Sequence, residues 1–293
     1  MSFADLLFGP ELIQFLQSLF GAEFNRIFVG ISLLGNDEVL VGLCAIVYWC
    51  FDKRRGRLVT YILLFGAYLN FYFKILVPSP RPPVDLRIAE RNETSFGFPS
   101  GHAQDSTTFW TWISFDFRKR MLAVLGTLIV AAIGISRIYL GVHYPGQVIG
   151  GWVIGFAFAG LCALIIQQLP APTGRVQAVQ QALFAIASLI PTFLAVWLGA
   201  VGEVNPGLVG GYLFGFSLGA IAEDRFVSFR TDVTTAKRIL RIIIGGAMTS
   251  LVVLALGRIV PDSSLISSFA DSFIRGLTVV LIAPAIFKIV ERS

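Results

Sequence analysis

Nine long apolar segments, most of them about twenty residues in length, set the strongest limit on what this chain can fold into. A helix of about 20 residues crosses the hydrocarbon core of a bilayer, whereas barrel strands are shorter and alternate in polarity. Charged residues make up only 14% of the chain, against roughly 25% in soluble domains. We predict an all-α, polytopic helical membrane protein with about nine transmembrane helices, at 27–50, 57–77, 102–117, 121–140, 145–167, 177–199, 207–223, 240–258 and 271–289.

The first residues of the chain differ from these segments. Residues 4–21 are apolar at helical spacing but are interrupted by Asp5, Pro10 and Glu11. A helix with one apolar and one polar face lies in the membrane interface and does not cross the bilayer. We therefore predict an N-terminal amphipathic, interfacial helix within residues 1–26.

The distribution of basic residues predicts the orientation. Fifteen of the 23 Lys and Arg residues lie in alternate loops and the C-terminal tail, mainly in clusters at 53–57, 118–120 and 225–241. Cytoplasmic loops carry such an excess. The prediction is an integral, multi-pass protein with its N-terminus outside, its C-terminus in the cytoplasm and the loops 78–101 and 141–146 on the extracytoplasmic (periplasmic, exterior or lumenal) face. Because the net charge of +5 comes from such clusters, no nucleic-acid partner is expected.

Two segments resemble each other, GGWVIGFAFAG at 150–160 and GGYLFGFSLGA at 210–220. Both carry small residues four apart, a spacing that lets helices approach closely in lipid. The second copy has no histidine or arginine nearby, so we predict that the repeat serves packing and is not a duplicated site. Glu223 and Asp224, just after the second copy, are predicted to be loop charges at the cytoplasmic end of a span.

The chain contains only two histidines, and both lie on the predicted extracytoplasmic side. His102 opens the third segment, and His143 lies in the short turn before the fifth. Lys74, Arg81 and Arg137 lie on the same side, at or just after the ends of the second and fourth segments. Charged groups near hydrocarbon are costly unless they are paired or functional. The five residues predict a pocket for a multiply charged anion, because Arg and Lys bind phosphate oxygens and histidine can attack phosphorus or donate a proton.

Other polar residues near these positions leave alternatives open. Asn36, Asp37 and Glu38 interrupt the first segment, either at the mouth of the pocket or as a polar break whose groups are satisfied inside the bundle. Asp105 follows His102 by one turn. It either accepts a hydrogen bond from an arginine of the pocket or is a carboxylate that favours the dipole at the helix N-terminus.

Three motifs carry a resemblance to a known family: K-x6-RP from Lys74 to Pro82, PSGH from Pro99 to His102, and SR-x5-H from Ser136 to His143. In this order, at helix ends on one face, they resemble the signatures of the type 2 phosphatidic acid phosphatase (PAP2) superfamily. That superfamily includes membrane lipid phosphatases, glucose-6-phosphatase and soluble vanadium haloperoxidases. The resemblance implies a PAP2-like catalytic helical core over 27–170 and additional C-terminal transmembrane helices over 171–293.

The resemblance also implies a role for each site residue. His143 would be the nucleophile that forms a phosphohistidine, and His102 would be the general acid and base that protonates the leaving oxygen and then activates water. The phosphate oxygens would be bound by Lys74, Arg81, Ser100, Gly101 and Arg137. No metal and no other cofactor would be needed, because these cations stabilise the charge on the transferred phosphoryl group.

One position departs from the family pattern. The third motif usually has Asp four residues after its histidine, and this chain has Gln147 there. Glutamine can accept one hydrogen bond from the imidazole and so orient His143, but it brings no charge. Glucose-6-phosphatase-like members also carry glutamine at this place and have nine spans, so the layout resembles that branch.

The resemblance implies an integral membrane phosphatase that hydrolyses a lipid or isoprenoid phosphate, as mono- or diphosphate. Its partner would be a membrane lipid carrying a phospholipid, sphingoid or isoprenoid phosphate. One alternative is a phosphatase of a soluble ester such as a sugar phosphate. A second alternative is a non-catalytic transporter or scaffold with a PAP2-like bundle. The sequence leaves the oligomeric state open.

Overall fold

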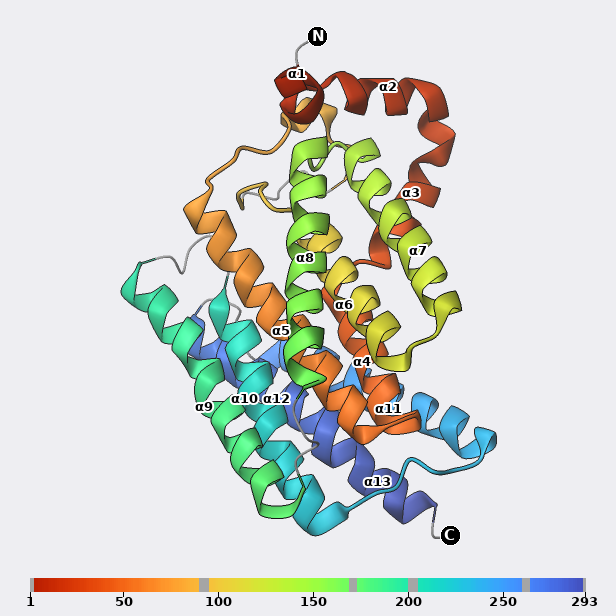
Figure 1. The fold of residues 1–293 in the computed structure, drawn as a ribbon, viewed down its shortest axis with the longest axis vertical. Helices are drawn as coiled ribbons and strands as arrows, with labels where there is room; N and C mark the ends of the chain where they lie inside the picture. The colour runs from red at the N-terminus through yellow and green to blue at the C-terminus, as the bar shows by residue number, and fades with distance from the viewer. Residues whose placement is uncertain (1–2, 90–94, 169–172, 200–204, 260–263, 292–293) are drawn as a thin grey trace. The chain divides into compact units, whose positions relative to one another are not determined.

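The computed structural model describes residues 3–89, 95–168, 173–199, 205–259 and 264–291, and within these ranges every regular element is helical (Figure 1). This confirms the predicted fold class. The α-helices are α1 (Phe3–Phe8), α2 (Glu11–Phe20), α3 (Asn25–Leu33), α4 (Asp37–Cys50), α5 (Lys53–Leu76), α6 (Gly101–Phe117), α7 (Arg120–Tyr139), α8 (Pro145–Ile166), α9 (Gly174–Trp197), α10 (Pro206–Ala222), α11 (Thr235–Ile259), α12 (Leu265–Leu277) and α13 (Ala283–Val290). Short 3₁₀ turns, η1 (Ala22–Phe24) and η2 (Val84–Leu86), and π-helical turns, η3 (Glu223–Val227) and η4 (Thr278–Ile282), complete them.

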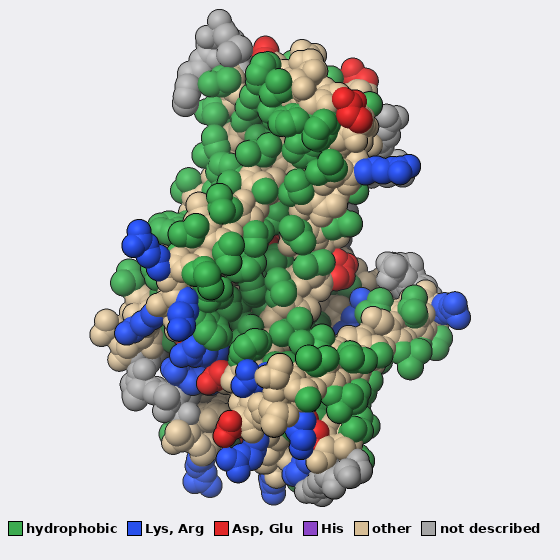
Figure 2. Space-filling model, turned by 90° about the vertical axis from the view of Figure 1, so that its right-hand side faces the viewer, with side chains coloured by type: hydrophobic (Ala, Val, Ile, Leu, Met, Phe, Trp, Pro, Cys, Tyr) green, Lys and Arg blue, Asp and Glu red, His purple; other side chains and the backbone are tan. Residues whose placement is uncertain are grey.

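The predicted count of nine spans is not confirmed. Among the described residues, six helices are long and apolar enough to cross a bilayer, and α3 with α4 makes a seventh if the pair is one span bent by 45°. Each predicted segment does contain helix, but α6 and α10 have only 17 residues each. Many large apolar side chains of the longer helices are exposed, among them Leu128, Val153, Leu164 and Leu251. Figure 2 shows one face of the molecule on which hydrophobic side chains predominate over much of the surface. Such a surface suits lipid, and the chain is an integral, multi-pass membrane protein.

The chain divides into two compact units. Unit 1 comprises Met1–Val41 and Phe65–Leu169, and unit 2 comprises Gly42–Leu64 and Pro170–Ser293. Every predicted site residue belongs to unit 1.

In unit 1, α6 packs closely against α8 because α8 presents small residues to it. A Cβ atom added at Gly151 would meet the backbone oxygen of Ser100, and one added at Gly155 would meet that of Gln104. The helices therefore approach backbone to backbone, as expected for small residues four apart. This confirms that the first copy of the repeat serves packing.

The N-terminal helices α1 and α2 lie beside the start of α8 and the end of α7 (Figure 1). Ile13 of α2 is fully buried against Ala103, Ile138 and Val148. The Gln17 side-chain amide donates to the backbone oxygens of Leu86 and Tyr139, at 2.9 Å each. The interfacial position of this segment stays a prediction. Within unit 1 it packs over the start of α6, the end of α7 and the start of α8.

In unit 2, the second copy of the repeat packs α10 against α12. Cβ atoms added at Gly211 and Gly215 would meet the backbone oxygens of Phe269 and Phe273. This copy also serves packing. It carries no predicted site residue.

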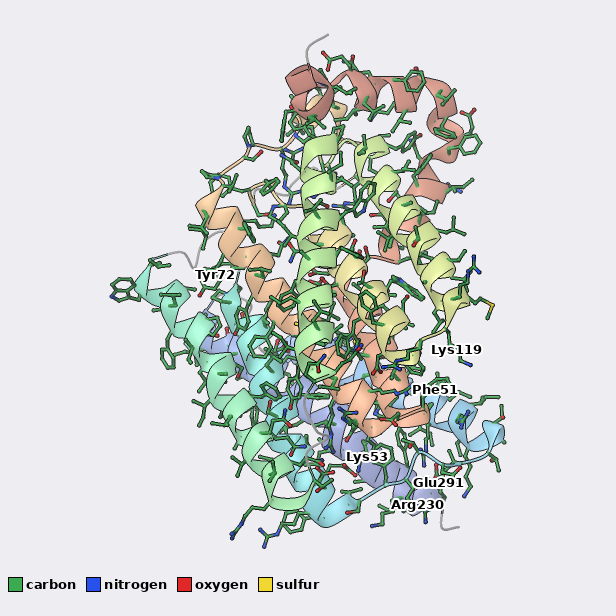
Figure 3. All side chains as sticks on the ribbon, in the orientation of Figure 1. Phe51, Lys53, Tyr72, Lys119, Arg230 and Glu291 are labelled. Carbon is green, nitrogen blue, oxygen red and sulfur yellow. The ribbon has the colours of Figure 1, made fainter. Side chains whose placement is uncertain are left out.

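The prediction of two loop charges after α10 is wrong for Glu223, which is fully buried. The π-helical turn η3 directs both carboxylates to the same partners from α5. Arg57 donates to both oxygens of Asp224 at 2.7 Å and to Glu223 Oε2 at 3.0 Å. Lys53, which is labelled in Figure 3, also belongs to this group: its Nζ lies 2.5 Å from Glu223 Oε2. This ionic cluster of Lys53, Arg57, Glu223 and Asp224 is a structural feature of unit 2.

Candidate active site

The predicted site residues meet at one end of unit 1, where four helices end or begin. Lys74 lies in the last turn of α5 and Arg137 in the last turn of α7. His102 lies in the first turn of α6, and His143 lies in the turn between α7 and α8. Pro78 and Pro80 follow α5 and prevent its continuation, because proline lacks the N–H that a helix interior requires. The following loop carries Arg81 into hydrogen-bonding distance of His143.

His143 is buried, and Gln147 holds its ring. Gln147 Nε2 donates to the Pro80 carbonyl at 2.7 Å and to Ser79 Oγ at 3.0 Å, and Gln147 Oε1 accepts from the Tyr144 N–H at 3.2 Å. These partners fix which end of the amide is oxygen. The atom that faces His143 Nδ1, at 3.1 Å, is therefore an acceptor, so Nδ1 carries the proton and Nε2 carries the lone pair.

Arg81 is held over the other side of the same ring. Its Nε donates to Ser95 O at 2.7 Å, and one terminal nitrogen donates to Ser95 Oγ at 3.0 Å. The other terminal nitrogen lies 3.1 Å from His143 Nε2 and 3.2 Å from Val142 O. Lys74 Nζ donates to the neighbouring Phe96 carbonyl. Residues 95 and 96 thus position two of the three predicted phosphate-binding cations.

Residues at the end of α3 and in the bend before α4 support Arg137 and His102. Arg137 is almost fully buried, and its guanidinium donates to Ser32 Oγ at 2.7 Å. His102 Nε2 lies 2.8 Å from Asn36 Oδ1. Of the two alternatives for the polar break at 36–38, Asn36 therefore fits the satisfied one, and its partner is a predicted catalytic histidine.

Ser100 and Gly101 form the start of α6. Ser100 is the N-terminal cap and is fully buried, and its N–H donates to the backbone oxygen of Gln147 at 3.0 Å. Its hydroxyl has no hydrogen-bond partner among the described residues. A buried hydroxyl without a partner is costly, so this group is suited to an oxygen of a bound anion at the helix N-terminus. Asp105 is also buried, and its Oδ1 has no hydrogen bond in the described part of the chain.

The electrostatics of the site act on His143. Burial, followed by the positive charges of Arg81, Arg137 and Lys74, holds the pKa of His143 well below its ordinary value, and the hydrogen bond that His143 donates to Gln147 only partly opposes this. The imidazole is therefore neutral near pH 7, the form in which Nε2 can attack phosphorus. The described residues include no group of three or more His, Cys, Asp or Glu side chains that could hold a metal ion.

Sequence reasoning missed the residues that support the predicted ones. They are Ser32, Ser79, Ser95 and Gly97. The hydrogen bond between Asn36 and His102 was also missed. A Cβ atom at Gly97 would overlap the Gln147 amide, so only glycine leaves room for that amide. A single serine or glycine belongs to no recognisable sequence motif, so these supporting residues could be identified only from the fold.

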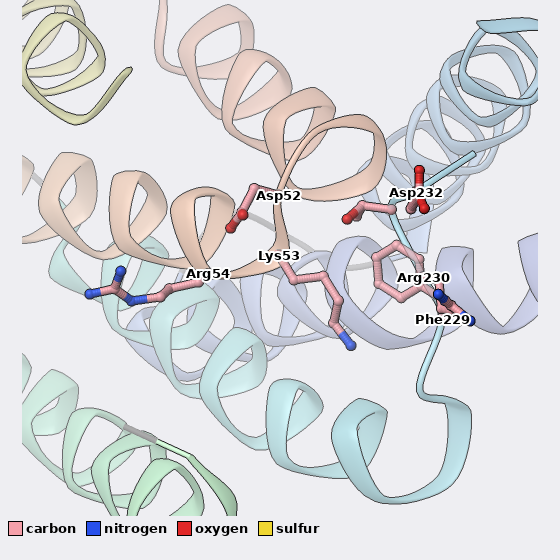
Figure 4. A pocket seen from close by; sticks show the side chains of 7 residues that line it. Asp52, Lys53, Arg54, Phe229, Arg230 and Asp232 are labelled. Carbon is pink, nitrogen blue, oxygen red and sulfur yellow. The ribbon is translucent and has the colours of Figure 1, made fainter. Parts of the chain in front are cut away.

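The hollow in Figure 4, of about 400 Å³, lies in unit 2 and contains none of the predicted site residues. It is lined by the start of α5 and by residues 229–232, with Lys53, Arg54 and Arg230 beside Asp52 and Asp232. Asp52 already accepts the Arg55 N–H at the α5 N-terminus. The hollow is therefore separate from the motif residues.

Comparison with known proteins agrees with the motifs. The chain is 29% identical over 144 residues to phosphatidylglycerophosphatase B of Bacillus subtilis, which covers 45% of this chain and 70% of that protein. It is 28% identical to an undecaprenyl-diphosphatase of Sulfolobus acidocaldarius (61% of this chain, 85% of that protein) and 26% identical to glucose-6-phosphatase 3 of Mus musculus (47% of each). A crystal structure of a transmembrane PAP2-type phosphatidylglycerolphosphate phosphatase from Bacillus subtilis aligns over 56% of this chain and 87% of that one, with 23% identity and a TM-score of 0.49.

Two family matches cover most of the chain. Residues 55–170 match the PAP2 superfamily, and residues 208–292 match the family described as PAP2 superfamily phosphatase, transmembrane extension. The first match contains all of the predicted site residues. Taken with the relatives, these matches show that the chain belongs to the PAP2 superfamily and is a membrane phosphatase.

Proposed function

We propose that this protein hydrolyses a lipid or isoprenoid phosphate through a phosphohistidine on His143, with a site on the extracytoplasmic face. The observation that carries the proposal is the state of His143. Gln147 holds the proton on Nδ1, and burial together with the nearby cations keeps the ring neutral, so the Nε2 lone pair points to the group that binds phosphate. This arrangement is that of an activated nucleophile.

Arg81 links phosphate binding to attack. Its terminal nitrogen donates toward the Nε2 lone pair. A phosphate oxygen, which is charged, is a better acceptor for a guanidinium than a neutral imidazole. Binding would therefore move the Arg81 hydrogen bond from Nε2 to the phosphate and free the lone pair for the phosphorus atom.

The reaction would have two steps. First, Nε2 forms a bond to phosphorus, the ester P–O bond breaks, and His102 gives a proton to the leaving oxygen. Second, water attacks phosphorus, His102 takes its proton, and the P–N bond breaks to release phosphate. Lys74, Arg81 and Arg137 stabilise the charge on the equatorial oxygens in both steps, with the Ser100 hydroxyl and the Gly101 N–H as further donors.

A lipid substrate is supported by the surroundings of the site. Unit 1 exposes apolar side chains on α7 and α8, including Leu128 and Val153, and the motif residues lie at the ends of these helices. An amphiphile could place its phosphate on the cations and its tail along such a surface. The extracytoplasmic face is inferred from the basic cluster Arg118–Arg120, which begins α7 at the end opposite to Arg137.

A soluble phosphate ester is the second candidate. It is favoured by Gln147, which replaces the usual aspartate, and by the similarity to glucose-6-phosphatase 3. The division of the chain into an interfacial segment at 1–26, a catalytic core at 27–170 and additional helices at 171–293 is part of the proposal.

The test is release of inorganic phosphate by the purified protein in detergent, with chelator present. The substrates are phosphatidic acid, phosphatidylglycerol phosphate, an isoprenoid diphosphate, a sphingoid-base phosphate and glucose-6-phosphate. We expect release from at least one lipid, loss of at least about 10³-fold in His143→Ala, and a ³²P-labelled intermediate that is stable to alkali and labile to acid. Preference for glucose-6-phosphate would favour the second candidate. Absence of both release and vanadate binding by folded protein would contradict the proposal.

A further inference from the structure

Both predicted catalytic histidines are held by a neutral amide oxygen. His143 Nδ1 lies 3.1 Å from Gln147 Oε1, and His102 Nε2 lies 2.8 Å from Asn36 Oδ1. Gln147 belongs to the third motif. Asn36 belongs to none of the three motifs and lies 66 residues before its partner.

The backbone around Asn36 is shaped for this contact. Helix α3 ends at Leu33 and α4 begins at Asp37, with a bend of 45° between them. The bend brings the chain against the first turn of α6, since a Cβ atom added at Gly35 would lie 3.2 Å from His102 Cβ. Asn36 then starts α4, with its carbonyl accepting the Leu40 N–H at 3.0 Å. A straight span would not place this side chain at the same point.

Two carboxylates lie near His102 and Asn36 in the chain. Asp37 directly follows Asn36, and Asp105 lies one turn after His102. The two carboxylates act on each other electrostatically, and Lys74 acts on Asp105. The neutral oxygen of Asn36 lies within hydrogen-bonding distance of His102 Nε2.

We propose that Asn36 is a positioning residue for His102: its amide oxygen holds the proton on Nε2, so that Nδ1 exchanges protons with the leaving group and with water. This inference rests on the proposed function. An amide oxygen orients the ring without adding charge. The ring can then be an acid in the first step and a base in the second, whereas a carboxylate would raise the pKa of the ring and keep more of it protonated.

The two steps respond differently to substitution. In Asn36→Asp the carboxylate stabilises protonated His102, so the ring can still protonate the leaving oxygen but rarely takes a proton from water. The phosphohistidine should therefore accumulate, with a burst of leaving group and a steady-state turnover about tenfold to a hundredfold slower. In Asn36→Leu, which has similar size and no acceptor, kcat should fall by a similar factor with KM little changed and with no burst.

The matched control is Asn25→Leu in α3. Asn25 Oδ1 accepts a hydrogen bond from the Tyr139 hydroxyl at 2.6 Å, so its loss also removes a partly buried hydrogen bond of unit 1, one in which neither histidine takes part. We expect kinetics like those of the unsubstituted protein. Vanadate binding verifies that each variant is folded.

The experiment is a rapid-quench measurement of phosphoenzyme and of leaving group, on the full chain in detergent. A burst in Asn36→Asp that Asn36→Leu and Asn25→Leu lack would support the inference. If the unsubstituted protein forms phosphoenzyme and Asn36→Asp turns over at the same rate with no accumulation, the positioning role is wrong and the proposed function stands. If the unsubstituted protein forms no phosphoenzyme, the proposed function fails first.

Discussion

Arginines donate hydrogen bonds in both units, and their partners differ. In unit 2, Arg57 donates to the carboxylates of Glu223 and Asp224, and Arg241 donates to both oxygens of Glu291 at 2.6 and 2.8 Å. In the site of unit 1, Arg81 donates to the backbone and hydroxyl of Ser95, and Arg137 donates to the hydroxyl of Ser32. Neutral oxygens fix the direction of a guanidinium without neutralising it. The first set is paired with carboxylates, and for the second set we propose the binding of an anion.

The largest effect should come from the site arginine. Arg137→Met removes one of the proposed phosphate-binding cations and should lower kcat/KM by about 10³-fold, or about 4 kcal/mol in the transition state. The free energy of unfolding should change little, because methionine fills a similar volume and its neighbour Ser32 is uncharged. Phosphate release and thermal unfolding in detergent measure the two quantities. A large drop in unfolding temperature, with activity per folded molecule retained, would show that Arg137 stabilises the fold and does not act on the substrate.

The converse should hold for Arg57→Met. Removing this guanidinium leaves the fully buried Glu223 and its neighbour Asp224 with weaker compensation, so the free energy of unfolding should fall by about 3 kcal/mol. Activity per folded molecule should be unchanged. A double variant, Arg57→Met with Glu223→Gln, should regain part of the stability. If Arg57→Met instead lost activity as Arg137→Met does, the distinction between the two sets of arginines would fail.

The smallest effect concerns the neutral amide beside His143. In Gln147→Glu a negative charge adjoins the imidazole and opposes Arg81, Arg137 and Lys74, so the pKa of His143 rises from its depressed value. Nucleophilic attack requires the neutral ring, and the acid limb of kcat/KM should therefore move to higher pH, by about one unit. Gln147→Asn keeps the neutral amide and should lower the rate without moving that limb. A pH–rate profile in Gln147→Glu identical to that of the unsubstituted protein would show that His143 does not set the acid limb.

The sequence predicted the helical membrane class and the convergence of the three motifs, because apolar length and motif chemistry are local properties. It could not predict the partners that hold those motifs. Asn36 meets His102 only because the first segment bends, and Arg57 meets Glu223 across 166 positions only because a π-helical turn redirects the end of α10. A glutamate at the end of an apolar segment looks like a solvated charge until its distant partner is known. The predicted number of spans is not confirmed for a related reason, since bends and helices of 17 residues do not follow from hydropathy.

The backbone contact between α6 and α8 has a consequence for how this family can diverge. Gly151 and Gly155 leave no side chain between the two helices, and the N–H of Ser100 donates directly to the Gln147 carbonyl. The separation of α6, which carries His102, from α8, which begins just after His143, is therefore set by main-chain dimensions. The opposite side of α8, with Val153, Phe156 and Leu164 exposed, contributes nothing to that separation. Substitution there can adapt the protein to bilayers of different thickness and lipid composition while the reacting groups keep their places.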